Sequence, residues 1–441
     1  MPAPPLFPTA TSTPSASPTA APSPSPIPSP VSRLGIDAQV LHGLTIRAWH
    51  PWFGNEAALF ESQVAEFNAT NPWGFQVVAV GQVNFAELFT NVTLALGSPD
   101  RPDLVISLSE HALAWDKAGV VDLTPYLTDP LWGLSADETA DFYPVLWDQD
   151  QIGGRRLGLP AQRTARLLFY NQSWARQLGF DSPPQTPDQF RRQACRANAS
   201  FRQNADPQDD ALGGWLIDPH PMTALGWMLA FGGGPLKGDA YHFLSPENLD
   251  AFRFIKTLFD DGCAFLAPDA NPADEFAARR ALFLAGDLED IPSLSRAFLE
   301  RGNPDRWIVL PFPGRQPTLV TYGSSYIILA KQPAEQLAAW LFLRWMLTPE
   351  QQARWVSAMG FLPVRRSALP LLDDYRIAYP QWAQAVEALP AAQGTPRLAS
   401  WRLMRQALGD GFAYLFRMNL PPGQIPTLLA EMDKLATEFE E

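Results

Sequence analysis

The chain has 441 residues, of which 46 % are hydrophobic and 18 % charged, so it is long enough for two domains with separate cores. Its formal net charge is -13 and its Lys and Arg residues are not clustered, which argues against nucleic acid or an anionic membrane as a partner. No uninterrupted apolar stretch of about 18 residues is present, so we expect no transmembrane helix.

The N-terminal segment differs in composition from the rest of the chain. Residues 1–30 consist almost entirely of Pro, Ser, Thr and Ala, a composition that does not bury a core. We therefore expect residues 1–40 to form an extended, disordered tether. No secretory signal and no cysteine for a lipid anchor is visible in this segment.

The first part of the predicted folded region alternates strands and helices. Apolar residues alternate over 44–49 and 75–80, and a short apolar run spans 104–108, which predicts three strands. Between them, apolar residues recur at helical spacing over 60–67 and 85–96. This order is typical of βαβ units, so we predict an α/β fold with mixed, mainly parallel sheets.

Three later helices share one start signal. A hydroxyl residue, a proline and an acid follow each other at Thr186-Pro187-Asp188, Ser245-Pro246-Glu247 and Thr348-Pro349-Glu350. The hydroxyl can cap the helix, the proline tolerates the first turn, and the acid complements the helix dipole. Gly360 is the expected end of the third helix.

The remaining elements follow from short apolar runs. Strands are predicted at 157–159, 167–170, 307–310 and 319–329. From Trp401 to Phe439 the pattern is helical, with a break at Pro421-Pro422.

No catalytic motif is found. The chain lacks a Gly-x-Ser-x-Gly elbow, a His-Glu-x-x-His helix, a P-loop and a dinucleotide fingerprint, and its five histidines show no metal-ligand spacing. We expect neither an enzyme nor a cofactor, although acids are plentiful enough that a carboxylate pair of a glycosidase stays an alternative. Cys195 and Cys263 are too few for a disulfide scaffold or a zinc site, and sequence alone slightly favours two free thiols.

Several modest motifs occur in an order that resembles one known family. They include Leu44–His50, Arg101–Val105, Lys117–Leu123, Leu157–Pro160, Leu168–Asn171, Thr186–Phe190, Leu310–Gly314, Leu347–Glu350 and Gly360–Val364. Over residues 42–441 the chain is similar to the family 1 extracellular solute-binding proteins of ABC importers, which include maltose-binding protein.

The resemblance implies a two-lobed, hinged fold of the type II periplasmic-binding-protein class. Lobe one would contain residues 42–152 and 309–357, and lobe two residues 158–305 and 362–441. The chain would cross between the lobes near Gly153-Gly154, Leu310–Phe312 and Phe361-Leu362.

In such folds the ligand lies beyond the carboxyl ends of the strands, between the lobes. In the first half of the chain this rule selects residues that follow predicted strands. Trp52 would offer a ring to a sugar face, Glu110 would accept hydroxyl bonds, and Arg163 would form a fork onto hydroxyls or a carboxylate. Glu110 could equally be a solvated acid and Arg163 a surface ion pair. The candidates here are His50, Trp52, Ser109, Glu110, Gln162 and Arg163.

In the second half of the chain, the resemblance selects the remaining candidates. An aromatic-glycine loop would bring backbone amides to the ligand, and a turn of small residues would offer amides and hydroxyls. Trp401 occupies the place where relatives offer a ring to a sugar, with helix packing as the alternative. The candidates here are Trp227, Phe231, Gly232, Gly233, Asp287, Tyr322, Ser324, Trp401 and Arg402.

The sequence thus predicts a protein that captures a small polar ligand. The 15 tryptophans favour a mono- or oligosaccharide, because aromatic rings cover the C–H faces of sugars. The resemblance implies the membrane subunits of an ABC permease as partners, a monomeric state, and a location outside the cytoplasm on the outer face of the cell membrane. A tethered carbohydrate sensor and an extracytoplasmic carbohydrate-active enzyme are the alternatives.

Overall fold

The computed structural model describes residue 1 and residues 31–267, 269–417 and 420–440. The tether expected at residues 2–30 lies outside the described residues. Residues 31–40, also expected to belong to the tether, lie against the folded body instead. The Ser32 hydroxyl and the Arg33 backbone amide donate to the Asp129 carboxylate at 3.0 and 2.7 Å, and a 3₁₀ helix spans Ala38–Leu41.

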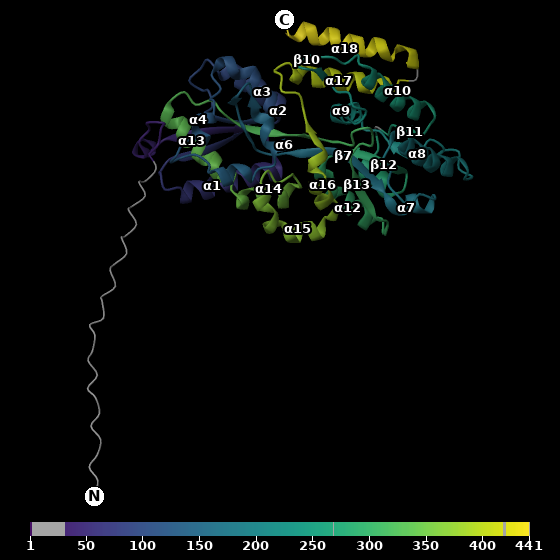
Figure 1. Cartoon of the computed structure of the whole chain (residues 1–441), viewed down its shortest axis with the longest axis horizontal. Helices are drawn as coiled ribbons and strands as arrows, with labels where there is room; N and C mark the ends of the chain where they lie inside the picture. The colour runs from purple at the N-terminus through teal and green to yellow at the C-terminus, as the bar shows by residue number, and fades with distance from the viewer. Residues whose placement is uncertain (2–30, 268, 418–419, 441) are drawn as a thin grey trace.

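Two sheets organise the described chain (Figure 1). The first has five strands among the described residues, in the order β2-β1-β3-β15-β6. We call the part built on it lobe one. Its strands are β1 Thr45–His50, β2 Gln76–Gly81, β3 Leu104–Leu108, β6 Leu159–Pro160 and β15 Ser324–Ile328.

The second sheet has seven strands among the described residues, and we call the part built on it lobe two. Six follow the order β11-β8-β12-β7-β14-β16, and β13 also pairs with β7. The strands are β7 Thr164–Asn171, β8 Gly213–Leu216, β11 Ala264–Phe265, β12 Ala281–Gly286, β13 Trp307–Leu310, β14 Leu319–Tyr322 and β16 Ala392–Gly394. Two short hairpins, β4–β5 (Gln151–Ile152 and Arg155–Arg156) and β9–β10 (Leu236–Lys237 and Ala240–Tyr241), lie outside both sheets.

Both sheets are mixed. In lobe one, β1 runs parallel to β2 and β3, whereas β15 runs antiparallel to β3 and β6. In lobe two, β8 is parallel to β11 and β12, and β14 to β16, but β7 is antiparallel to β12, β13 and β14. All eight residues of β7 are buried, as expected for a central strand with partners on both sides.

Helices cover the sheets, as the alternating pattern predicted. In lobe one, α1 (Gly54–Thr70) packs on β2, α2 (Phe85–Ala95) and α3 (Ser109–Trp115) on β3, and α13 (Pro333–Met346) on β1 and β15. In lobe two, α8 (Pro187–Arg202) packs on β8 and β12, and α9 (Pro221–Ala230) on β7 and β14. The C-terminal helices α17 (Trp401–Leu415) and α18 (Ile425–Glu440) pack on each other, and α17 also packs on α9.

The remaining helices complete the two lobes. They are α4 Thr124–Leu127, α5 Ala136–Ala140, α6 Pro144–Trp147, α7 Gln172–Gln177, α10 Pro246–Asp260, α11 Pro272–Ala277, α12 Ile291–Glu300, α14 Pro349–Met359, α15 Asp373–Ala378 and α16 Pro380–Glu387. None of the described helices has both the length and the apolar character needed to cross a membrane.

The predicted helix starts can be compared with the structure directly. The side chains of Thr186 and Ser245 accept hydrogen bonds from Gln189 and Asn248 backbone amides, so both cap their helices. Thr348 precedes α14 without a side-chain cap bond. Gly360 ends α14 with a φ of 85°, the left-handed conformation that favours glycine.

Three expectations about strands and crossings are wrong. The strand predicted at 319–329 is two strands, because Gly323 separates β14 in lobe two from β15 in lobe one. Gly153-Gly154 is the turn of the β4–β5 hairpin, where both glycines have positive φ, and not a crossing. Leu310–Phe312 is not a crossing either, since β13 and β14 belong to the same sheet. Residues 309–322 therefore follow lobe two.

A disulfide links Cys195 of α8 to Cys263, just before β11, so the leaning towards free thiols is corrected. The bond closes a loop with a sequence separation of 68 residues around β8, α9 and α10. Such a closure restricts the unfolded chain more than the folded one, and so it should stabilise lobe two.

We predict that the double variant Cys195→Ser/Cys263→Ser loses about 2–4 kcal/mol of unfolding free energy. Urea denaturation followed by circular dichroism measures the loss. A thiol reductant should lower the midpoint of the unchanged protein by a similar amount and leave that of the double variant where it is. A midpoint that the reductant does not move in the unchanged protein would show that the bond contributes no stability.

Candidate ligand-binding cleft

Three chain segments meet where the two lobes join. Residues 161–163 connect β6 of lobe one to β7 of lobe two, and Gly323 connects β14 to β15. The third segment, Phe361-Leu362, follows α14 and lies beside the first, because the Leu362 amide donates to the Arg163 carbonyl at 2.7 Å. At Gly323 (φ +150°) an added Cβ would lie 2.1 Å from the Gln162 carbonyl oxygen, so only glycine lets the first two segments pass this closely. We propose this junction as the hinge.

Arg163 holds the junction together and is not available to a ligand. Its side chain is fully buried and donates to Asp150 at 2.7 Å and to the Ser325 hydroxyl at 3.1 Å. It also donates to the carbonyl oxygen of Ser324. The roles suggested by the sequence, ligand fork or surface ion pair, are both replaced by an interior one.

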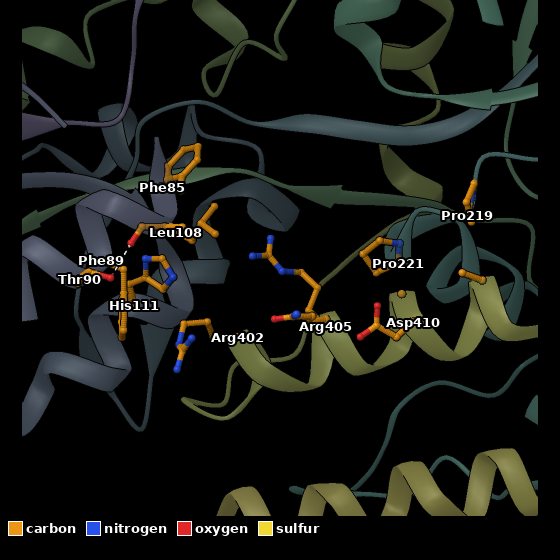
Figure 2. A pocket seen from close by; sticks show the side chains of 14 residues that line it. Phe85, Phe89, Thr90, Leu108, His111, Pro219, Pro221, Arg402, Arg405 and Asp410 are labelled. Atoms are coloured by element: carbon orange, nitrogen blue, oxygen red, sulfur yellow. Dashed lines mark hydrogen bonds between the residues drawn. The ribbon is translucent and has the colours of Figure 1, made fainter. Parts of the chain in front are cut away.

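Two adjoining cavities lie between the lobes and together form what we call the cleft. The inner cavity, of about 410 Å³, is bounded by lobe-one residues around the start of α1 and by lobe-two residues of β7, β14 and the loop after β12. The outer cavity, of about 620 Å³, lies between α2 and α3 of lobe one and α17 of lobe two (Figure 2). Phe85, Leu108 and Arg405 line both cavities, so the two spaces adjoin at these side chains.

Arg405 links the lobes across the cleft. In Figure 2 its side chain extends from α17 into the space between the two groups of lining residues. Its guanidinium lies 3.7 Å from the carboxylate of Glu110 in α3. One turn earlier on α17, Arg402 lies over the ring of Phe89, 4.5 Å from its centroid. The cleft thus contains ionic and cation–π contacts between the lobes.

Arg166 of β7 organises the charges on the lobe-two side of the cleft. Its buried guanidinium donates to Asp287 at 2.9 Å and to the Thr223 hydroxyl at 3.0 Å, and it forms an ion pair with Asp218. The Tyr322 hydroxyl donates to the other oxygen of Asp287 at 2.7 Å. Burial, and next the charge of Asp287, raises the pKa of the Tyr322 hydroxyl well above its ordinary value. Tyr322 therefore stays a neutral donor.

Glu289, in the same loop as Asp287, has a strongly raised pKa. Glu289 accepts a hydrogen bond from the Thr164 hydroxyl and lines the inner cavity. Enclosure raises the pKa of its carboxyl to about 8, and the nearby charge of Asp287 adds to the effect. At neutral pH this carboxyl is mostly protonated unless a positive charge joins it.

The structure brings about half of the sequence candidates to the cleft. Trp52, Gln162, Tyr322 and Ser324 line the inner cavity, and Arg402 lines the outer one. Glu110 reaches the cleft through its ion pair with Arg405, and Asp287 lies directly behind Tyr322. His50 is buried below Trp52, with their ring centroids 5.5 Å apart. Ser109 is half-buried at the start of α3 and lines neither cavity.

Other candidates lie elsewhere. Trp227 and Trp401 are fully buried in the core of lobe two, where aromatic and aliphatic side chains surround them. Phe231 lines a separate surface cavity with Arg253 and Arg315, and Gly232-Gly233 follows it. For Trp401 the packing alternative is therefore the one that the structure supports.

The sequence reasoning missed several cleft residues. Arg405 lies three positions after Arg402 on the same helix face, and Phe85 and Phe89 are likewise one turn apart on α2, so helical spacing could have indicated them. Glu289 lies two residues after Asp287 in an acidic loop. For Glu56 and Thr164 the sequence carries no comparable signal.

The fold and the cleft define a two-lobed α/β binding protein of the solute-binding class. Residues 62–391 match the family described as bacterial extracellular solute-binding proteins, and the chain belongs to this family. A putative binding protein of Brucella abortus is 23 % identical over 349 residues, covering 78 % of this chain and 80 % of the relative. A probable ABC transporter-binding protein of Deinococcus radiodurans is 23 % identical over 201 residues, covering 42 % of this chain and 47 % of the relative.

Solved structures support the fold. The sugar-binding protein MalE of Xanthomonas citri superposes with a TM-score of 0.74 at 21 % identity, covering 90 % of this chain and 97 % of that one. At this identity the likeness shows the two-lobed fold and leaves the ligand open.

We predict that Trp401→Ala lowers the unfolding free energy by about 3–5 kcal/mol, because it removes a fully buried ring from the lobe-two core. Trp401→Phe should cost less, since it keeps most of the volume. Urea denaturation of both variants measures the difference. If Trp401→Ala were as stable as the unchanged chain, the core position would be contradicted.

His50 generates a prediction about acid stability. Within the described chain neither of its ring nitrogens has a hydrogen-bond partner, and burial lowers its pKa to about 4. Between pH 6.5 and 4, His50 is protonated in the unfolded chain but stays neutral in the folded protein. The unfolding free energy should therefore be unaffected above pH 6.5 and fall as the pH drops, by up to about 1.4 kcal/mol per pH unit for this group.

Denaturation midpoints measured from pH 7 to 4 test the prediction. His50→Phe should make the decline shallower by about one proton's contribution. His42→Gln, at an exposed position, should keep the full decline. Equal slopes in the His50→Phe variant and the unchanged chain would contradict the role of His50.

Proposed function

We propose that the chain captures a small polyhydroxylated ligand, a mono- or oligosaccharide, in the cleft. The observation that carries the proposal is a pair of adjoining cavities lined by aromatic rings and polar groups from both lobes. Trp52, Phe85 and Tyr322 offer rings for the C–H faces of a sugar. Gln162 and Ser324 offer hydrogen-bonding groups for its hydroxyl rim. The sugar-binding structural neighbour gives additional support.

Capture would work by closure about the hinge. A ligand that touches both lobes at once makes its full set of contacts only when they are together, so it shifts the population towards the closed form. The closed protein then delivers its ligand to the membrane subunits of an ABC importer, a role supported by the name of the Deinococcus relative. We further propose that the chain acts as a monomer outside the cytoplasm, with the N-terminal segment as its tether.

A thermal-shift screen tests the proposal, with glucose, maltose, maltotriose and mannotriose as saccharides and amino acids, peptides and polyamines as the other classes. A ligand at 100 times its dissociation constant should stabilise the protein by about 2.7 kcal/mol, which raises the midpoint by a few degrees. Trp52→Leu and Tyr322→Phe should weaken the shift. Trp73→Leu is the matched control, because Trp73 is partly exposed in lobe one and lines neither cavity.

The results distinguish sugar binding in the cleft from binding of another ligand class and from binding at another site. A shift with saccharides that the cleft variants lose and Trp73→Leu keeps would support capture in the cleft. A shift only with amino acids, peptides or polyamines would reject the sugar and retain a binding protein. A shift that Trp52→Leu and Tyr322→Phe leave unchanged would reject this cleft as the site.

A further inference from the structure

Two glutamates from opposite lobes line the inner cavity. Glu56 enters it from α1 of lobe one, and Glu289 from the 3₁₀ helix Leu288–Asp290 of lobe two. Among the described residues neither glutamate takes part in an ion pair, although both line the same cavity. Two buried or partly buried acids at one cavity that form no ion pair are costly to ionise.

The cations nearby are already engaged. Arg166 is held by Asp218 and Asp287, and Arg405 is drawn to Glu110. Arg405 is the one basic residue among those that line the inner cavity, as far as the chain is described. The protein therefore provides the acids of this cavity with no dedicated partner of opposite charge.

The titration of both glutamates agrees with this imbalance. Burial raises the pKa of the Glu56 carboxyl, and enclosure with the Asp287 charge raises that of Glu289 to about 8. A positive charge delivered from outside would reverse the shift and let both groups ionise. The groups that act on Glu289 are Asp287 and Asp290 of its own loop, Thr164 of β7, Tyr322 of β14 and Tyr375 of α15. Glu56 and Arg405 line the same cavity, and Arg166 of β7 is paired with Asp287.

Aromatic rings surround the same two acids. Trp52, Phe53, Phe85, Tyr322 and Phe361 all line the inner cavity. Ring faces carry partial negative charge and attract ammonium groups, most strongly where water is excluded. Acids combined with rings form a better environment for a cation than for an anion.

An unpaired donor indicates what else the ligand carries. Gln162 lines the inner cavity and is 5 % exposed. Its oxygen accepts from the Ser324 hydroxyl at 2.8 Å, but its Nε2 has no partner in the described structure. A buried amide N–H without a partner costs about 1–3 kcal/mol, which a ligand oxygen would recover once the side chain turns towards the cavity.

We propose that the inner cavity binds the ammonium group of a hydroxylated ligand, of the amino-sugar type, between Glu56 and Glu289, with Gln162 donating to a ligand oxygen. This inference rests on the proposed role of the cleft in ligand capture and narrows its ligand class. Selectivity arises because a neutral sugar leaves the two acids without a counter-charge, whereas an ammonium group pairs with both.

Isothermal titration calorimetry of the whole chain at pH 6 tests the inference with matched saccharides. The probes are glucosamine, glucose and N-acetylglucosamine, and the corresponding β-1,4-linked trimers. The ammonium-bearing member of a set should bind at least about ten-fold more tightly than its neutral counterparts. In two buffers of different ionisation enthalpy, its binding should release protons, because Glu289 ionises on pairing.

Three variants separate the contributions. Glu289→Gln and Glu56→Gln should each remove about ten-fold of the preference for the ammonium ligand while affinity for neutral saccharides stays similar. Glu289→Gln should also reduce proton release, because only the Glu56 carboxyl could then ionise on pairing. Glu61→Gln is the matched control, since Glu61 is an exposed acid on the same helix as Glu56. Thermal midpoints confirm that all three variants are folded.

The outcomes distinguish this inference from the proposed function. Neutral saccharides that bind as tightly as the ammonium forms would overturn the inference and leave sugar capture in place. A preference for the ammonium forms that survives both Glu→Gln changes would also overturn it, because the cation would then lie elsewhere. If no saccharide of either kind binds, the sugar proposal fails together with the inference.

Discussion

The buried ion pair between Arg163 and Asp150 is the contact on which the arrangement of the lobes depends. Arg163 is the last residue of the first crossing segment. Its carbonyl accepts a hydrogen bond from the Leu362 amide of the third segment. Its guanidinium pairs with Asp150 and donates to Ser324 and Ser325, which follow the second segment. A buried charge of this kind is costly unless every donor finds a partner, and loss of one member leaves the other uncompensated. One residue therefore contacts all three crossing segments and fixes their relative position at the junction.

Local patterns in the sequence predicted much of the fold, but not the places where the chain changes lobe. Alternation and helical spacing identified β1 through β3, and capping residues located α8 and α10. The apolar run over 319–329 did not show that its two halves join different sheets, because both halves are buried strands and only their partners differ. Partner choice is a tertiary property that no local window contains. Gly153-Gly154 had the composition of a hinge and the geometry of a hairpin turn.

The sequence predicted cleft residues correctly where the end of a strand determines that a residue lines the cleft. It failed where the direction of a side chain on a helix determines this. Residues after strand ends, such as Trp52, Gln162 and Tyr322, do line the space between the lobes. Trp401 stands on a helix that borders the cleft, yet its ring points into the core, while Arg405 one turn later points into the gap. The sequence shows a tryptophan in the same way whether its ring packs in the core or contacts a ligand, so only the fold distinguishes the two roles.

The ion pair between Glu110 and Arg405 contributes to holding the two lobes together. It joins the lobes at 3.7 Å, and about 29 % of the Arg405 side chain is exposed to water. An attraction with one open member weakens as mobile ions accumulate around it. The equilibrium between the open and closed forms would then depend on the ionic strength of the medium. Outside the cytoplasm the cell does not control the ionic strength. The open form, which admits the ligand, would therefore be more populated at high salt than at low salt.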